Sequence, residues 1–335
     1  MIEKYSLPFI EPVERWNQNT TFSDLAIKVN LGDRYLAWEN NRYINCTFVN
    51  QPHEKGFYIS LIDDWSTWEG VIIRQIFSFD KETYLSCGTD TAELLKKCIA
   101  SGSYVLGNCN GKYIDESYEG VEDRPYFSYM LTGFDDEKGT FTVKGVDHHF
   151  CYRSYEVKYR TFVDSIFDIC GGGLVLELRQ FNPDVEILPN IPRCIAHLED
   201  YIGGTSREMF FKDRVYGIAA VEALGEYCAD ANNTDREICG NLLDCLADHK
   251  MFMRMRVEYW AEQGWVNNSH IKRAREAENM AYDAIELNKK YIKSGDGELL
   301  ARLNAAIKNI MYAEKQYLPQ VLDEIKSAYE IESKL

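Results

Sequence analysis

From about residue 205 onward, apolar side chains recur with the period of an α-helix. The amphipathic stretches are 208–229, 237–262, 269–293 and 297–332. Each carries an apolar stripe that must be buried against a neighbour, as Leu303, Ile307 and Ile310 show in the last stretch. Four such stretches in succession predict an all-α helical bundle over residues 205–335. Pro319 falls inside the last stretch and is expected to kink or split that helix.

The preceding residues, 1–204, have a different pattern and are predicted to form an α/β domain. Aromatic residues are frequent between 35 and 62, which indicates strands and turns. Residues 89–102 read as a capped helix that Gly102 ends. Two β-prone runs joined by Asp-Asp-Glu-Lys-Gly form a hairpin over 125–146, and the fold class is therefore α+β.

The formal charge of −16 restricts the partners of the chain. Phosphate backbones and anionic lipids require clustered Lys and Arg, so neither nucleic acid nor a membrane is an expected partner. A cationic ligand such as an amine or diamine would be attracted. The first residues lack a signal-peptide pattern and no apolar run is long enough to span a bilayer, which predicts a cytoplasmic protein. The bundle is also compatible with a homodimer.

Cysteine and histidine side chains in the front half are candidates for acyl-transfer chemistry. Cysteine acyl transfer needs a thiolate, a histidine that moves its proton, and an acid that orients the histidine. Cys46 lies among aromatic residues, and Cys109 ends a predicted strand beside two asparagines. Asp147, His148 and His149 follow the hairpin. The alternative interpretation is that both thiols are ordinary buried core residues.

A metal site and a bound cofactor are not expected. The ten cysteines contain no Cys-x-x-Cys pair, and the only close grouping of soft ligands joins Cys151 to the two preceding histidines. His249 shares an apolar helix face with Leu246 and Trp260, which favours a hydrogen-bonded core histidine. Tryptophans near the front, such as Trp38, would line either an aromatic pocket or a core.

Three blocks of sequence resemble a known family. They are SGSYVLGNCNGKYID (101–115), PYFSYMLTGFDDEKGTFTVKGVD (125–147) and LLDCLADHKMFMRMRVEYW (242–260). Together they are similar to the butirosin-biosynthesis-H-like family, in which a papain- or C39-peptidase-like fold serves antibiotic biosynthesis. The resemblance implies an acyltransferase or amide synthetase. It would take an acyl group, expected to be aromatic, from the phosphopantetheine thioester of a carrier protein through a cysteine thioester to an amine, without a cofactor of its own.

The sequence departs from the family pattern at two positions. The pattern has a cysteine at the start of the first helix, where this chain has Thr20, Thr21 and Phe22, and a histidine on the first hairpin strand, where it has Tyr126 to Ser128. Asp147 matches the position of the acid. Two alternatives follow. The nucleophile and base have moved to the other cysteines and histidines of the front half, or they are lost and the chain is a non-catalytic module that docks a carrier protein or a small aromatic ligand.

Overall fold

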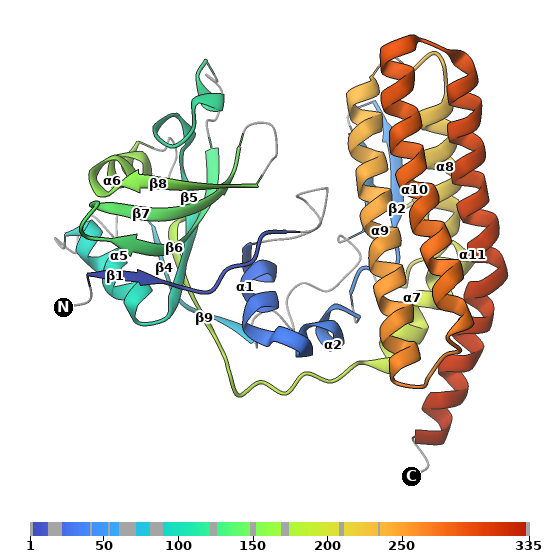
Figure 1. Cartoon of the computed structure of the whole chain (residues 1–335), viewed down its shortest axis with the longest axis horizontal. Helices are drawn as coiled ribbons and strands as arrows, with labels where there is room; N and C mark the ends of the chain where they lie inside the picture. The colour runs from blue at the N-terminus through green and yellow to red at the C-terminus, as the bar shows by residue number, and fades with distance from the viewer. Residues whose placement is uncertain are drawn as a thin grey trace. The chain divides into compact units, whose positions relative to one another are not determined.

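The structure is a computed structural model with two compact units (Figure 1). The described residues are 3–12, 22–40, 42–52, 54–59, 72–80, 90–120, 126–147, 152–168, 174–207, 211–233 and 235–332. The first unit comprises Met1–Val13, Thr20–Gly32 and Trp65–Glu186, and the second comprises Glu14–Asn19, Asp33–Asp64 and Ile187–Leu335. The protein is thus a mixed α+β chain with antiparallel sheets and a helical C-terminal region.

The first unit is built on one antiparallel sheet in the order β4-β9-β5-β6-β7-β8, with β1 paired to β6 off this path. The strands are β1 (Lys4–Ser6), β4 (Ile73–Asp80), β5 (Ser103–Asn110), β6 (Tyr126–Asp135), β7 (Thr140–Val146), β8 (Tyr152–Lys158) and β9 (Leu174–Phe181). The expected hairpin is confirmed as β6 and β7, whose register joins Asp135 to Thr140. Gly139 takes φ +64° in the turn, a conformation that glycine adopts without strain.

Helices pack on this sheet and bury aromatic side chains. They are α1 (Phe22–Leu31), α5 (Thr91–Ala100) and α6 (Tyr159–Phe167), with short 3₁₀ turns at Gly111–Tyr113 and Glu116–Tyr118. A further 3₁₀ turn, Gly32–Arg34, directly follows α1, and its last two residues belong to the second unit. Helix α5 contacts β5 and β6, α6 contacts β5, β7 and β8, and α1 contacts β9. Asp90 caps α5 by accepting the backbone N–H of Glu93 at 3.3 Å. In the core, the ring of Phe162 meets Tyr129 edge-on at 5.0 Å.

The second unit is a helical bundle with a small sheet. Its helices are α2 (Tyr35–Glu39), α7 (Ile191–Gly203), α8 (Gly217–Ala229), α9 (Arg236–Glu262), α10 (Ser269–Ser294) and α11 (Gly297–Glu332), and its strands are β2 (Thr47–Gln51), β3 (Glu54–Tyr58) and β10 (Val215–Tyr216). Helix α10 packs between α9 and α11, and α11 also contacts α7 and α8 (Figure 1). The apolar stripes predicted from the helical period face this common core.

The compact units differ from the two sequence ranges expected, 1–204 and 205–335. Residues 33–64 and 187–204 belong to the helical unit, where β2 pairs with both β3 and β10. The stretch 35–62 was expected to hold only strands and turns, but it begins with α2. Several of its apolar residues, including Ile44 and Phe57, are buried in the bundle core. A sequence pattern predicts an element, and the partner of that element is set by long-range packing.

Helix α11 runs without a break from Gly297 to Glu332 although Pro319 lies inside it. Of the two expected outcomes, the split is therefore wrong, and the kink stays a prediction. Proline removes one backbone N–H, so the carbonyl of Lys315 loses its usual donor, but Leu318 and Val321 on either side are fully buried. Burial of the flanking turns outweighs one missing hydrogen bond.

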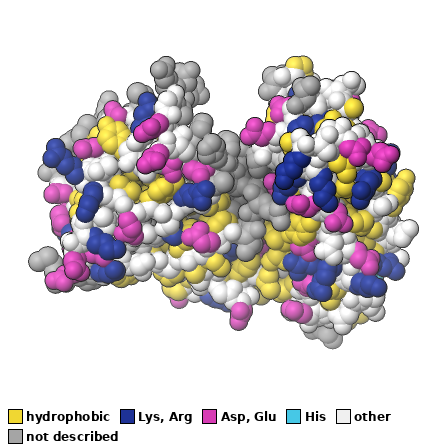
Figure 2. Space-filling view, turned by 45° about the horizontal axis from the view of Figure 1, so that its top comes forward, with side chains coloured by type: hydrophobic (Ala, Val, Ile, Leu, Met, Phe, Trp, Pro, Cys, Tyr) yellow, Lys and Arg dark blue, Asp and Glu magenta, His cyan; other side chains and the backbone are white. Residues whose placement is uncertain are grey.

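Charges of both signs are interspersed on the face of each unit that Figure 2 shows. The excess of acidic residues is therefore not gathered into one patch among the described residues of that face. None of the helices in the described part of the chain combines the length and the apolar character that crossing a membrane requires.

Candidate functional site

Cys46 lies in the core of the helical unit, directly before β2, with no exposed surface. Its thiol donates a hydrogen bond to the carbonyl oxygen of Gly217 at 3.4 Å. Burial raises the pKa of this thiol far above its ordinary value, more than Lys250 lowers it. A protonated, enclosed thiol is a poor nucleophile, so the position matches the alternative interpretation of a core residue.

Cys109 lies on β5 of the first unit and is also completely buried. It pairs across the sheet with Phe127, and burial raises its pKa to about 12 although a hydrogen bond with Ser165 lowers it. This thiol therefore lacks both the exposure and the acidity of a reactive cysteine.

Asp147 directly follows β7 and is 5% exposed. Its Oδ2 accepts a hydrogen bond from Nε of Arg153 at 3.1 Å. His148 and His149 lie outside the described residues, as does Cys151. Of the tryptophans near the front, Trp38 is buried, and Trp65 and Trp68 lie outside the described residues. The structure therefore brings Cys109 and Asp147 into one unit and Cys46 into the other, and the proposed pairing of a thiol with His148 or His149 stays a prediction.

His249 occupies the core of the bundle with no exposed surface. Its Nε2 lies 3.0 Å from the carbonyl oxygen of Ile44, so the neutral ring carries its proton on Nε2 and donates it there. Burial and the neighbouring Lys250 hold the pKa of this histidine well below its usual range. It is a neutral structural residue, as its place on an apolar face indicated.

A buried cluster of three polar side chains was missed by sequence reasoning. Nζ of Lys250 lies 2.8 Å from both carboxylate oxygens of Glu314 and 2.7 Å from the hydroxyl of Tyr201. The Tyr201 hydroxyl in turn donates to Oε2 of Glu314 at 2.6 Å. All three N–H groups of the ammonium thus have acceptors, and neither charged side chain has any exposed surface.

The sequence carried a signal for this cluster. Glu314 stands four residues after Ile310 and three before Tyr317, which is the position where the apolar stripe of α11 should continue. Lys250 likewise lies between Leu246 and Met253 on the stripe of α9. Charges of opposite sign on two facing stripes indicate a buried ion pair.

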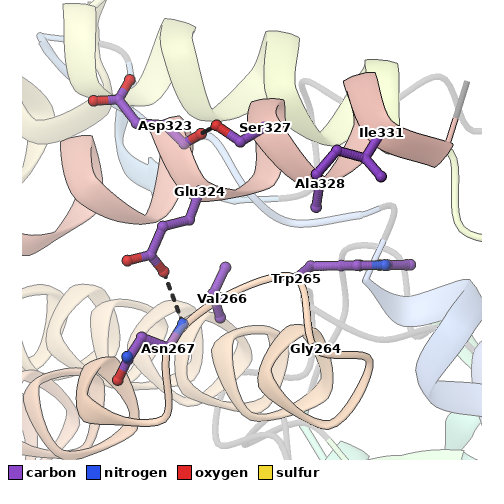
Figure 3. A pocket seen from close by; sticks show the side chains of 9 residues that line it. All are labelled: Gly264, Trp265, Val266, Asn267, Asp323, Glu324, Ser327, Ala328 and Ile331. Atoms are coloured by element: carbon purple, nitrogen blue, oxygen red, sulfur yellow. Dashed lines mark hydrogen bonds between the residues drawn. The ribbon is translucent and has the colours of Figure 1, made fainter. Parts of the chain in front are cut away.

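A groove of about 580 Å³ lies in the helical unit (Figure 3). One wall is the α9–α10 turn, from Gly264 to Asn267, and the other is the last turns of α11. Asp323, Glu324, Ser327, Ala328 and Ile331 line the second wall. The spacing of Glu324, Ala328 and Ile331 by four and three residues places them on one helix face.

Two features of the turn shape this groove. Gly264 adopts φ +75°, which ends α9 and lets the chain reverse. The indole of Trp265 then lies below Ala328 and Ile331, as Figure 3 shows. Ile331 is 62% exposed, so an apolar surface is open to solvent between these residues. Such a surface is able to bury a flat apolar group.

The groove also carries negative charge. Glu324 reaches across it, where Oε2 accepts the backbone N–H of Asn267 at 2.7 Å and Oε1 lies 3.2 Å from Nε2 of His270. Asp323, which directly precedes Glu324, is exposed to solvent. An apolar floor beside two carboxylates is complementary to a ligand with an apolar body and a cationic group.

Among the described residues, no three His, Cys, Asp or Glu side chains are grouped closely enough to hold a metal ion. No protein-family model matches the chain, and a search of curated proteins finds no significant match. The candidate site therefore stands on its geometry alone.

Proposed function

We propose that this chain is a binding module for a small amine with an aromatic or other apolar body, and that the groove of Trp265 and Glu324 is its site. The observation that supports this proposal is an exposed apolar surface, formed by Trp265, Ala328 and Ile331, beside the carboxylates of Asp323 and Glu324. The volume of about 580 Å³ is in the range of ligand sites, and the charge of −16 on the chain attracts cations.

We also propose that the first unit is a papain-like scaffold that has lost its catalytic groups. On β6, where the resembling family has a histidine, the buried ring of Phe127 lies so close to Gly145 that a Cβ there would meet a ring carbon at 1.8 Å. At the start of α1, Phe22 packs edge-on against Tyr152 at 5.7 Å. Aromatic packing at both positions supports a structural role for this unit.

Covalent acyl transfer from a carrier-protein thioester, which the resemblance implies, is the less favoured function. The two cysteines singled out for it, Cys46 and Cys109, are enclosed and have raised pKa values. Transfer through another cysteine would leave an acyl adduct on that residue after incubation with a thioester. An adduct on a single cysteine, visible by mass spectrometry and discharged by an amine, would replace the proposal of a non-catalytic module.

The binding proposal is tested by calorimetric titration with 2-phenylethylamine and with 3-phenylpropionate, which have similar bodies and opposite charges. An amine of this size is expected to bind with a Kd of about 1 mM or tighter, and the acid at least several-fold more weakly. Equal affinity for both probes, or no binding of the amine, would refute the proposal.

Substitutions in and outside the groove test whether the amine binds there. Glu324→Gln keeps the shape of the side chain and the acceptor for the Asn267 N–H but removes the charge, so it should weaken amine binding about two- to fivefold. Trp265→Ala removes the ring that the apolar body of the amine would contact, and it should also weaken binding. Asp283→Asn removes an exposed carboxylate from α10 outside the groove and is the matched control. If Asp283→Asn weakens binding as much as Glu324→Gln, the amine responds to the net charge and not to the groove.

A further inference from the structure

His270 lies behind the carboxylate that reaches across the groove. Nε2 of His270 is 3.2 Å from Oε1 of Glu324, while Oε2 of the same carboxylate accepts the backbone N–H of Asn267 at 2.7 Å. The side chain of His270 is 3% exposed and that of Glu324 is 38% exposed. A ligand in the groove therefore meets the carboxylate, and the imidazole is placed to act on the ligand through Glu324.

The hydrogen bonds of the imidazole identify its tautomer. Nδ1 of His270 is buried and has no hydrogen-bond partner among the described residues, whereas Nε2 faces Glu324. An ionised carboxylate only accepts, so the neutral ring carries its proton on Nε2 and donates it to Glu324. The fully buried ring of Tyr317 lies at 28° to the imidazole with the centroids 6.3 Å apart, so packing also restrains the imidazole.

Opposing effects act on the charge of His270, and the fold favours neither form alone. Histidine is the side chain whose charge ordinarily changes between about pH 5 and 8. The Glu324 carboxylate favours the imidazolium. His270 also lies in the first turn of α10, where the positive end of the helix dipole disfavours a second positive charge.

Other groups on the elements packed around His270 are either neutral or bound elsewhere. Tyr317 of α11 stays neutral, because burial raises its pKa well above its usual value. Helix α9 carries Arg256, whose buried guanidinium is bound to backbone carbonyl oxygens. Charged side chains near this contact in sequence are exposed to solvent, namely Lys272 and Arg273 on α10 and Asp323 on α11.

We propose that His270 is a positioning residue that makes amine binding in the groove depend on pH, an inference that rests on the amine site proposed above. The neutral imidazole holds the Glu324 carboxylate by donating a hydrogen bond and leaves its negative charge for the ligand. The imidazolium neutralises that charge and repels an ammonium group. Because the proton and the amine compete for one carboxylate, each weakens the binding of the other by the same factor.

Calorimetric titration with 2-phenylethylamine at about pH 8 and about pH 5.5 tests this dependence. The probe is an ammonium ion at both pH values. Its Kd should rise about two- to fivefold in acid, the loss also expected for Glu324→Gln, because each change removes the same charge. In His270→Gln the side-chain amide still donates to Glu324 but does not titrate, so the ratio of the two Kd values should fall to about one.

His197→Gln is the matched control. His197 is also a buried histidine of the helical unit, but it lies on α7, with its Nε2 3.2 Å from Nε of Arg193. This variant should keep the wild-type ratio of Kd values. Glu324→Gln should lower the ratio, since the charge that favours the imidazolium is gone. That second variant tests the coupling if His270→Gln does not fold.

Proton release on binding separates a titrating role of His270 from a purely structural one. At about pH 6.5, calorimetry in two buffers of different ionisation enthalpy should show that the wild-type protein releases protons as the amine binds. His270→Gln should release none. A histidine that only supports the packing of the groove would change the affinity without changing the number of protons released.

The outcomes distinguish this proposal from the proposed function. No amine binding at about pH 8 refutes both. Binding with the same Kd at both pH values overturns the role of His270 and leaves amine binding in the groove intact. A pH dependence that persists in His270→Gln does the same, because another group then carries it.

Discussion

The ammonium of Lys250 lies 2.8 Å from both carboxylate oxygens of Glu314, and neither side chain reaches solvent. Two charges in a helical core are tolerated only as a pair, since the attraction between them offsets the cost of removing each from water. The pair joins α9 to α11, and the Tyr201 hydroxyl adds α7 to the same cluster. Three helices are thus fixed in relative position by one buried polar cluster.

Removal of one charge of this pair should be far more harmful than removal of both. Lys250→Met leaves the Glu314 carboxylate buried and uncompensated, and we expect a loss of about 3–5 kcal/mol in the free energy of unfolding. Lys250→Met combined with Glu314→Leu should recover most of that loss. Urea unfolding of the three proteins measures both values. A double variant as unstable as the single one would show that the contact contributes more than mutual neutralisation.

Gly217 should tolerate no side chain. It has φ +61°, and a Cβ would lie 2.1 Å from the carbonyl oxygen of Tyr201. Gly217→Ala is expected to cost roughly 2–4 kcal/mol in the free energy of unfolding from strain and steric overlap. Gly295→Ala is the control, because Gly295 has φ +68° but nothing within 4 Å of its Cβ position, so only about 1–2 kcal/mol of strain applies. Equal losses of unfolding free energy in the two variants would show that the fold around residue 217 shifts enough to relieve the overlap with Tyr201.

The sequence predicted the helices of the bundle and the β6–β7 hairpin because both follow from local periodicity and turn chemistry. It did not predict that residues 33–64 join the helical unit, since one of the two partners of β2 is β10, far along the chain. Residue type and neighbouring residues single out Cys46 and Cys109, but neither reports that both thiols are buried. The groove at Trp265 arises where a turn meets a helix face, a tertiary relation that no local pattern encodes.

His249 should make the stability of the helical unit depend on pH. Its pKa in the folded protein is well below the ordinary value of 6.5, so it stays neutral in the fold and gains a proton on unfolding in acid. The full stability is therefore present above pH 6.5 and is lost as the pH falls below it, by up to about 1.4 kcal/mol per pH unit from this residue.

Comparison with His249→Gln isolates that contribution, because glutamine does not titrate and its amide is able to donate to the Ile44 carbonyl in place of Nε2. Below pH 6.5 the wild-type unfolding free energy should fall more steeply than that of the variant. Parallel pH profiles would mean that the histidine is protonated inside the fold.

The rate at which each cysteine is alkylated in the native protein is a direct test of the proposal that this chain is a non-catalytic module. In the native protein, alkylation by iodoacetamide should reach Cys98 first, since it is the described cysteine that is only half-buried, while Cys46 and Cys109 should remain unmodified. Their S–H groups are enclosed, and burial raises both pKa values. Mass mapping after limited alkylation, with a denatured sample as the reference for full reactivity, measures the order. Modification of Cys46 or Cys109 before Cys98 would mean that the native fold opens to admit a reagent to that thiol, and covalent acyl transfer would then become the better account of this chain.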